Sequence, residues 1–178
     1  MGSAAQRPSN TEFAPFYGRY IDLAPEGDII AQLRENGATL AATLTPLDDT
    51  RAGFRYASDK WSVREIIGHL IDSERIFVYR ALRIARGDTT PLAGFEQNDY
   101  VSTADSDARA LADLRDEHRA LRESTVRFFG SLSEAAWTRT GVASNSTISV
   151  RALARIVLGH THHHLRVLAD KYQVPTQK

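Results

Sequence analysis

The chain has 178 residues, no cysteine, and balanced charge, with 22 Lys+Arg against 22 Asp+Glu. This length suits one domain with a hydrophobic core. The missing cysteines exclude disulfides, thiolate metal ligands and a cysteine nucleophile. Without a basic excess we expect no nucleic-acid partner. No apolar run reaches the roughly 18 residues that read as a membrane span, and the N-terminus lacks an apolar signal region. We therefore expect a cytoplasmic protein with no membrane partner.

The N-terminal part of the chain is rich in proline and aromatic residues. We predict an irregular arm over residues 1–25, whose aromatic side chains pack on one domain over residues 26–173. Within that domain the first helix should run from about residue 28 to about residue 45. Its apolar positions recur at helical spacing and are Ile29, Leu33, Leu40, Leu44 and Leu47.

The sequence predicts three further helices. The second should begin at Ser62, because Ser62 and Glu65 form a capping-box pattern, and should end near Arg86. The third is expected over about 107–129 and the fourth over about 149–172, each with apolar residues at steps of three and four. Four long helices of similar length predict an all-α four-helix bundle.

Two connections are too long or too unusual to be simple turns. Residues 87–106 far exceed the usual ~2–8 residues of a helix–helix loop, so they should form a crossover along the bundle or a lid. Residues 139–149 mix Gly, Asn and Ser with β-branched residues and are consistent with a small extended excursion. The fold prediction therefore includes a long crossover between the second and third helices.

Four of the six histidines lie within residues 160–164. Residues four apart on a helix differ by only about 40° around its axis, so His160 and His164 share one face. Two imidazoles that face a core need a polar partner, and one divalent metal ion can serve both. The same face carries the apolar residues Leu153, Ile156, Val157, Val167 and Leu168.

A third metal ligand must come from another helix. His69 shares its stripe on the second helix with Ile66, Ser73 and Ile76, which makes it the candidate. Three neutral imidazoles suit Zn, Ni or Fe and leave positions for water or substrate, as in catalytic sites. We therefore predict one divalent ion on His69, His160 and His164. For either histidine of the pair alone, a hydrogen-bonded core residue is the alternative.

The remaining histidines have other predicted roles. His162 should face solvent and His163 should lie on the flank of the helix. His118 lies on a helix seam without a partner at helical spacing, which indicates a hydrogen-bonded core residue.

Two acidic residues lie about one turn from His69. Either Glu65 or Asp72 could orient that imidazole by accepting its second ring N–H. The capping box is the favoured role for Glu65, and an ion pair with Arg75 is the alternative for Asp72.

Arg80 falls about 20° from the direction of His69 but roughly 16 Å further along the helix axis. An inward arginine usually has a carboxylate partner, and Glu96 or Asp99 could provide it. We therefore interpret Arg80 as an anchor for the long connection, with a contact to a substrate acid as the alternative.

Aromatic residues near these elements have two possible roles. Phe95 and Tyr100 belong to the long connection, and one of them should insert between helices, unless the connection is a mobile lid. Trp61, before the second helix, is favoured as a core residue over a platform for substrate.

Several segments together resemble the DinB-like metal-binding four-helix-bundle superfamily, which includes the bacillithiol- and mycothiol-dependent S-transferases. The resemblance covers roughly residues 26–172 and implies a metal triad of one histidine on the second helix and an H-x-x-x-H pair on the fourth. These roles fall on His69, His160 and His164. The segments that carry it are Lys60–Leu70, Asp72–Arg75, Tyr79–Arg83, Gly94–Tyr100 and Leu158–His164.

The resemblance also implies a function. Members described as enzymes add low-molecular-weight thiols to electrophiles or isomerise small organic acids. We therefore expect a metal-dependent small-molecule transferase of the thiol S-transferase type, or a hydrolase, with a low-molecular-weight thiol as co-substrate. The alternative is a non-enzymatic bundle with a structural or ligand-sensing metal site. A homodimer is compatible with this reading.

Overall fold

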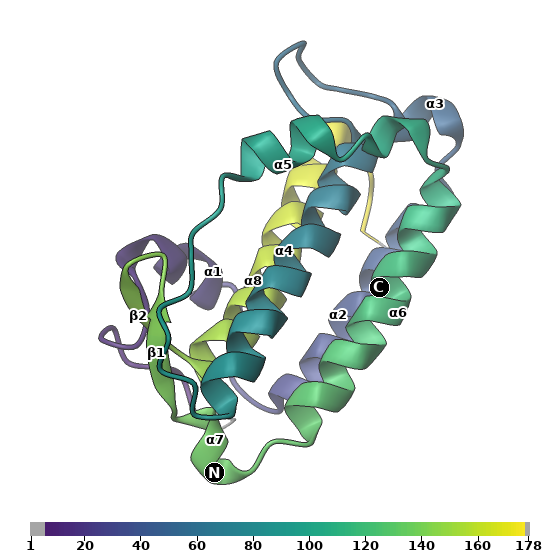
Figure 1. Cartoon of the computed structure of the whole chain (residues 1–178). Coiled ribbons are helices and arrows are strands. Elements are labelled where there is room, and N and C mark those ends of the chain that lie inside the picture. Colours follow the sequence, from purple (N-terminus) through teal and green to yellow (C-terminus); the bar gives the residue numbers. More distant parts are fainter. Residues whose placement is uncertain (1–5, 177–178) are drawn as a thin grey trace.

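Four long helices form the body of the protein in a computed structural model that describes residues 6–176 (Figure 1). They pack in the cyclic order α2, α6, α4, α8, so that α2 and α4 lie diagonally opposite. The predicted four-helix bundle is confirmed, with boundaries close to those expected. Residues 1–5 of the predicted arm lie outside the described residues. The helices are α2 (Ile29–Leu44), α4 (Val63–Ala85), α6 (Leu111–Gly130) and α8 (Val150–Tyr172).

Side-chain caps fix the starts of three of these helices. Asp28 accepts hydrogen bonds from the backbone N–H groups of the first turn of α2. Ser62 and Glu65 form the predicted capping box of α4, and Ser149 caps α8. Each cap satisfies N–H groups that have no partner inside the helix, and the capping box at Ser62 and Glu65 is the one that located a helix start from the sequence.

The core consists of two apolar clusters separated by a polar layer. One cluster fills the end that holds the second half of α4 and the first half of α8, and the other fills the opposite end. Buried polar side chains from all four long helices lie between them. This layer contains Asn36, His69, Ser73, Glu74, His118, Arg122, Thr125, His160, Thr161 and His164.

The N-terminal arm packs on α8. It contains a 3-10 turn at Pro15–Tyr17 and the short helix α1 (Gly18–Ile21), so it is more regular than expected. Phe13, Tyr20 and Ile21 are buried in the core. Arg151 of α8 pairs with Glu12, and this hydrogen bond lowers the pKa of the Glu12 carboxyl to about 2. The division into an arm (1–25) and a domain (26–173) remains a prediction.

The crossover from α4 to α6 runs along the outside of the bundle (Figure 1). It includes α5 (Gln97–Thr103) and a 3-10 turn at Ser106–Ala108. Its extended part pairs with the small hairpin of β1 (Thr140–Ala143) and β2 (Ser146–Ser149), since Leu92 exchanges backbone hydrogen bonds with Val142 and Ser144. The predicted extended excursion over 139–149 is this hairpin, which follows the short helix α7 (Glu134–Trp137).

Two details of the crossover differ from prediction. Arg80 does not pair with Glu96 or Asp99; its Nη2 donates to the carbonyl of Ala93 at 2.7 Å and to Ser144 Oγ at 3.1 Å. The physical reason is the start of α5, where the Glu96 carboxylate accepts the backbone N–H of Asn98 and stays exposed.

No crossover aromatic inserts fully between helices. Tyr100 is 45% exposed, and Phe95 is half-buried. Val101 is the buried hydrophobic residue of α5. None of the described helices is long and apolar enough to cross a membrane.

Candidate metal centre

The structure brings His69, His160 and His164 together in the polar layer. The Nε2 atoms of His69 and His160 lie 3.0 Å apart, and those of His164 and His160 lie 3.1 Å apart. One ligand nitrogen from each residue falls within 4.8 Å of the other two. All three side chains are buried. Three imidazoles from two helices therefore converge on one point.

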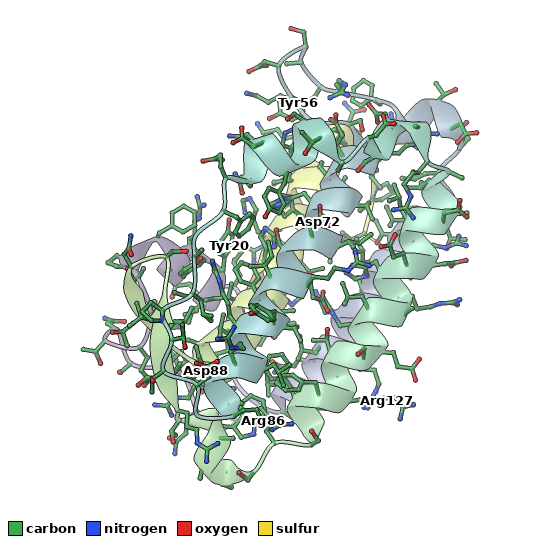
Figure 2. All side chains as sticks on the ribbon, viewed as in Figure 1. Tyr20, Tyr56, Asp72, Arg86, Asp88 and Arg127 are labelled. Atoms are coloured by element: carbon green, nitrogen blue, oxygen red, sulfur yellow. The ribbon has the colours of Figure 1, made fainter. Side chains whose placement is uncertain are left out.

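Local packing fixes the orientation of these rings. His160 and His164 lie one turn apart on α8, and His69 faces them from the adjacent helix α4. The ring of Trp61 lies 4.8 Å from that of His69, centroid to centroid, and the ring of Tyr20 lies 5.0 Å from that of His160. Tyr20 is held where α1 meets the bundle (Figure 2).

Burial keeps all three imidazoles neutral. Desolvation, followed by the charge of His163, lowers the pKa of His69 to about 4. Burial also holds the pKa values of His160 and His164 well below 6.5, with a smaller contribution from neighbouring histidines. A neutral imidazole keeps one nitrogen lone pair, which is what a metal ligand needs.

The three residues fit a divalent metal ion. With Zn–N distances of about 2.0–2.1 Å, ligand nitrogens lie roughly 3–3.4 Å apart, close to the two short separations observed here. The alternative is mutual hydrogen bonding, but three neutral rings whose Nε2 atoms face one point cannot satisfy one another fully. The Nδ1 atom of His164 is also buried with no hydrogen-bond partner in the described chain.

The orienting contacts differ from those considered from sequence. Glu65 serves the capping box and an ion pair with Arg55, and Asp72 lies 3.8 Å from Arg75. Neither contacts His69. Instead, Ser73 Oγ lies 3.4 Å from His69 Nδ1. The spacing of four residues was the available signal for Ser73, and sequence reasoning used it only to place Ser73 on the same stripe.

The other histidines lie outside the triad. His118 is buried, as predicted for a core residue, but its Nε2 lies 3.7 Å from the Glu74 carboxylate and makes no hydrogen bond among the described residues. His162 is half-buried rather than facing solvent, because burial around α8 extends further than helix geometry alone suggested. His163 is half-buried on the flank, as predicted, with its ring 5.6 Å from that of Tyr20.

Two clefts reach the histidine cluster from different sides. The first has a volume of about 390 Å³ and the second about 310 Å³. His69 and His160 line the first cleft, His164 lines the second, and Asn98 of α5 lines both. Trp61 packs against the core, as favoured from the sequence, and also lines the second cleft.

A groove larger than these two clefts lies elsewhere. It has a volume of about 760 Å³ and runs between α2 and α6 over small residues such as Gly37, Ala38 and Ala41. None of the three histidines lines it. Residues of the three-histidine cluster line the two smaller clefts instead.

Comparison with known proteins identifies the family. The model of the DinB superfamily matches residues 32–168, so this chain belongs to the DinB superfamily. OB0413, a proposed metal-dependent hydrolase of Oceanobacillus iheyensis, is 24% identical over 128 residues, which are 71% of this chain and 73% of OB0413.

Two solved structures share the fold. YfiT of Bacillus subtilis, described as a proposed metal-dependent hydrolase with an unusual four-helix-bundle topology, has a TM-score of 0.72 at 16% identity. The alignment covers 95% of this chain and 91% of YfiT. The mycothiol-dependent maleylpyruvate isomerase has a TM-score of 0.61 at 17% identity, over 80% of this chain and 61% of the isomerase.

Proposed function

We propose that this protein binds one divalent metal ion on His69, His160 and His164 and uses it to catalyse a reaction of a small molecule. The observation that carries the proposal is the convergence of three buried, neutral Nε2 atoms at a point that two clefts reach. Imidazole nitrogens suit Zn, Ni or Fe. Three protein ligands are the number typical of catalytic zinc sites, which keep a position open, whereas structural sites use four.

The chemistry of the ligand set favours activation of a nucleophile. When bound, the ion would supply positive charge that lowers the pKa of a coordinated water or thiol. The protein's own residues would bind and orient the substrate and would exclude water. Trp61 and Tyr20 pack against His69 and His160 and restrict their rings, and Ser73 lies beside the outer nitrogen of His69.

Two clefts favour transfer between two organic molecules. Hydrolysis needs space for one organic substrate and water, whereas transfer of a thiol to an electrophile needs space for both reactants. Asn98 lines both clefts, and each cleft is lined by at least one of the three histidines. We therefore propose a low-molecular-weight thiol and its electrophile as the two substrates.

Hydrolysis is the second candidate. The names given to OB0413 and YfiT favour it. A non-enzymatic, structural metal site would call for a fourth protein ligand, and no fourth His, Cys, Asp or Glu joins the three-histidine group among the described residues.

The metal site is tested by elemental analysis of protein purified without an affinity tag. We expect about one divalent ion per chain, as one three-histidine site allows. His164→Ala should remove most of the metal, and His162→Ala, on the same helix but outside the cluster, should retain it. Equal loss in both variants would contradict the assigned ligand set.

The reaction class is tested on metal-loaded protein with two assays, each repeated after chelation. The first follows loss of a small thiol, such as cysteine, in the presence of an activated aryl halide. The second follows cleavage of an activated ester. Metal-dependent thiol consumption supports the transferase, and metal-dependent ester cleavage alone supports the hydrolase. A metal-loaded protein inactive in both assays, across several thiols and esters, would favour the non-enzymatic alternative.

A further inference from the structure

Arg122 and Arg80 are buried in this bundle to a similar degree, but their hydrogen-bond partners differ in charge. Arg122 is 3% exposed and forms a forked ion pair with Glu74. Arg80 is 2% exposed, and its two hydrogen-bond acceptors, the Ala93 carbonyl and the Ser144 hydroxyl, are both neutral. Its Nη1 atom is buried with no hydrogen-bond partner in the described part of the chain. A buried cation normally has an anionic partner.

Arg80 does not line the first cleft, but it lies next to residues that do. His69, Ser73 and Phe77, at successive spacings of four residues on α4, line that cleft, and Arg80 continues the same stripe one turn further. Phe95 also lines the cleft, and its ring centroid lies 5.8 Å from Arg80 Cζ. Phe95 therefore stands between the cleft and the guanidinium.

The separation along α4 sets the size of a ligand that could reach both His69 and Arg80. Residues 69 and 80 are roughly 16 Å apart along the helix axis, and both side chains lean towards the N-terminus of α4, so the lean does little to shorten their separation. An acid as small as benzoate could therefore bind at Arg80 without reaching the histidines, and only a longer acid would contact both.

The lining of the first cleft suits an acid with an unsaturated or aromatic body. Five aromatic residues line it, and they are Phe16, Tyr17, Tyr20, Phe77 and Phe95. Arg19 lies over the rings of Phe16 and Tyr20 and adds positive charge at the rim. The carboxylate facing this cleft is that of Glu96, which is exposed and caps α5.

The extended segment before α5 covers Arg80. The extended segment before α5 is fixed to the hairpin through backbone hydrogen bonds of Leu92, and Arg80 itself bonds the carbonyl of Ala93. Beyond that point Phe95 is only half-buried. A side-chain rotation of Phe95 would open Nη1 to the cleft without breaking the pairing with the hairpin.

We propose that Arg80 is the carboxylate-binding residue for a small organic acid that enters the first cleft, with Phe95 as the side chain that moves aside. The planar guanidinium provides forked N–H donors that match a carboxylate. A role for this acid as the substrate rests on the proposed metal-dependent function, whereas binding of the anion by Arg80 does not.

The experiment uses benzoate as the probe and chelator-treated protein, so that the metal cannot hold the carboxylate. Titration calorimetry should show binding of benzoate to the wild-type chain and none of benzamide, its neutral analogue. Arg80→Met, which keeps length and removes charge, should weaken benzoate binding at least tenfold. Arg80→Lys should retain part of it. The control Arg83→Met removes an arginine one turn along the same helix, in an ion pair with Asp88, and should bind benzoate like the wild type.

Three results would overturn the proposal. They are no benzoate binding to the wild-type chain, equal binding to Arg80→Met, and stronger Arg80-dependent binding of inorganic phosphate than of benzoate. If Arg80→Met does not fold, the test compares the other two variants. Arg80→Lys should then bind benzoate more weakly than Arg83→Met. Because the protein is metal-free, this test does not depend on whether the three histidines hold an ion, and metal analysis does not depend on Arg80.

Discussion

The backbone carbonyl of Tyr20 lies directly against Gly159 of α8, so close that a Cβ atom at residue 159 would stand 1.8 Å from the carbonyl oxygen. This approach places α1 on α8 one residue before His160. It also brings the ring of Tyr20 into contact with His160 and makes it a wall of the first cleft. The absence of a side chain at Gly159 is therefore a condition for the shape of the candidate site.

Gly159→Ala should destabilise the protein although alanine is the better helix former. Overpacking of this kind costs about 1–3 kcal/mol, and the clash is with backbone, which cannot rotate away. Urea unfolding measures the loss. Gly130→Ala is the matched control, since a Cβ there would meet Ile30 at 3.9 Å, an ordinary contact. Equal stability of the two variants would contradict the close approach of α1.

The buried ion pair between Arg122 and Glu74 should be strongly coupled. Arg122 Nε and Nη2 donate to the two carboxylate oxygens at 2.9 and 2.8 Å, and Nη2 also donates to Thr161. Glu74→Gln or Arg122→Met alone should cost about 3–5 kcal/mol, because each leaves a buried charge unpaired. The double variant should cost clearly less than the sum, as measured by urea unfolding.

The control for this buried pair is an exposed ion pair on α6. Arg127 projects from the outer side of α6 (Figure 2) and pairs with Glu123, whose side chain is also largely exposed. Arg127→Met should change the unfolding free energy by about 0.5 kcal/mol or less. Additive effects of the two buried substitutions would mean that Glu74 and Arg122 do not depend on one another.

The metal-free protein should lose stability as the pH falls from 7 to 5, and His118 should account for part of the loss. Burial, followed by the charge of Arg122 and opposed by Glu74, lowers its pKa from 6.5 to about 4. Between these values the unfolded chain takes up a proton and the folded chain does not. The contribution of neutral His118 to the free energy of unfolding is thus fully present well above pH 6.5. At pH 5 the free energy of unfolding is lower by about 2 kcal/mol.

His118→Gln tests this contribution, because glutamine does not titrate. The fall in unfolding free energy between pH 7 and pH 5, measured by urea titration with chelator present, should be about 2 kcal/mol smaller than in the wild type. His162→Gln removes a half-buried histidine and should change the slope less. An unchanged slope in His118→Gln would show that His118 already carries a proton in the folded state at pH 5.

Removal of the metal should lower the melting temperature but leave the bundle folded. A ligand that binds only the folded state at 100 times its dissociation constant contributes about 2.7 kcal/mol, which is roughly 5–10 °C for a chain of this size. The apolar clusters at the two ends of the bundle do not include the histidines, so helical circular dichroism should persist after chelation. Unfolding at room temperature on chelation would instead identify a structural site and remove the main support for an enzyme.

The sequence by itself determined the helices, most of their ends and which histidines share a face. Helix periodicity and capping are local properties, so Ser62 with Glu65, and His160 with His164, could be read within one or two turns of chain. His69 lies on a different helix and was predicted from its position on the same stripe as Ile66 and Ile76; the resemblance to the DinB superfamily implies the same residue.

The tertiary structure decided the contacts between segments distant in the chain. Ser73 rather than Glu65 or Asp72 lies beside His69, and Arg80 bonds Ala93 and Ser144 rather than a carboxylate. The second difference has two causes: Glu96 caps α5 instead of facing Arg80, and the turn of the hairpin brings Ser144 next to the crossover. No local pattern in the sequence predicts this packing. Helix geometry gives the direction in which a side chain leaves the helix axis. The partner of that side chain depends on how whole elements pack against one another. The packing is settled only when all four helices, the arm and the crossover are in place.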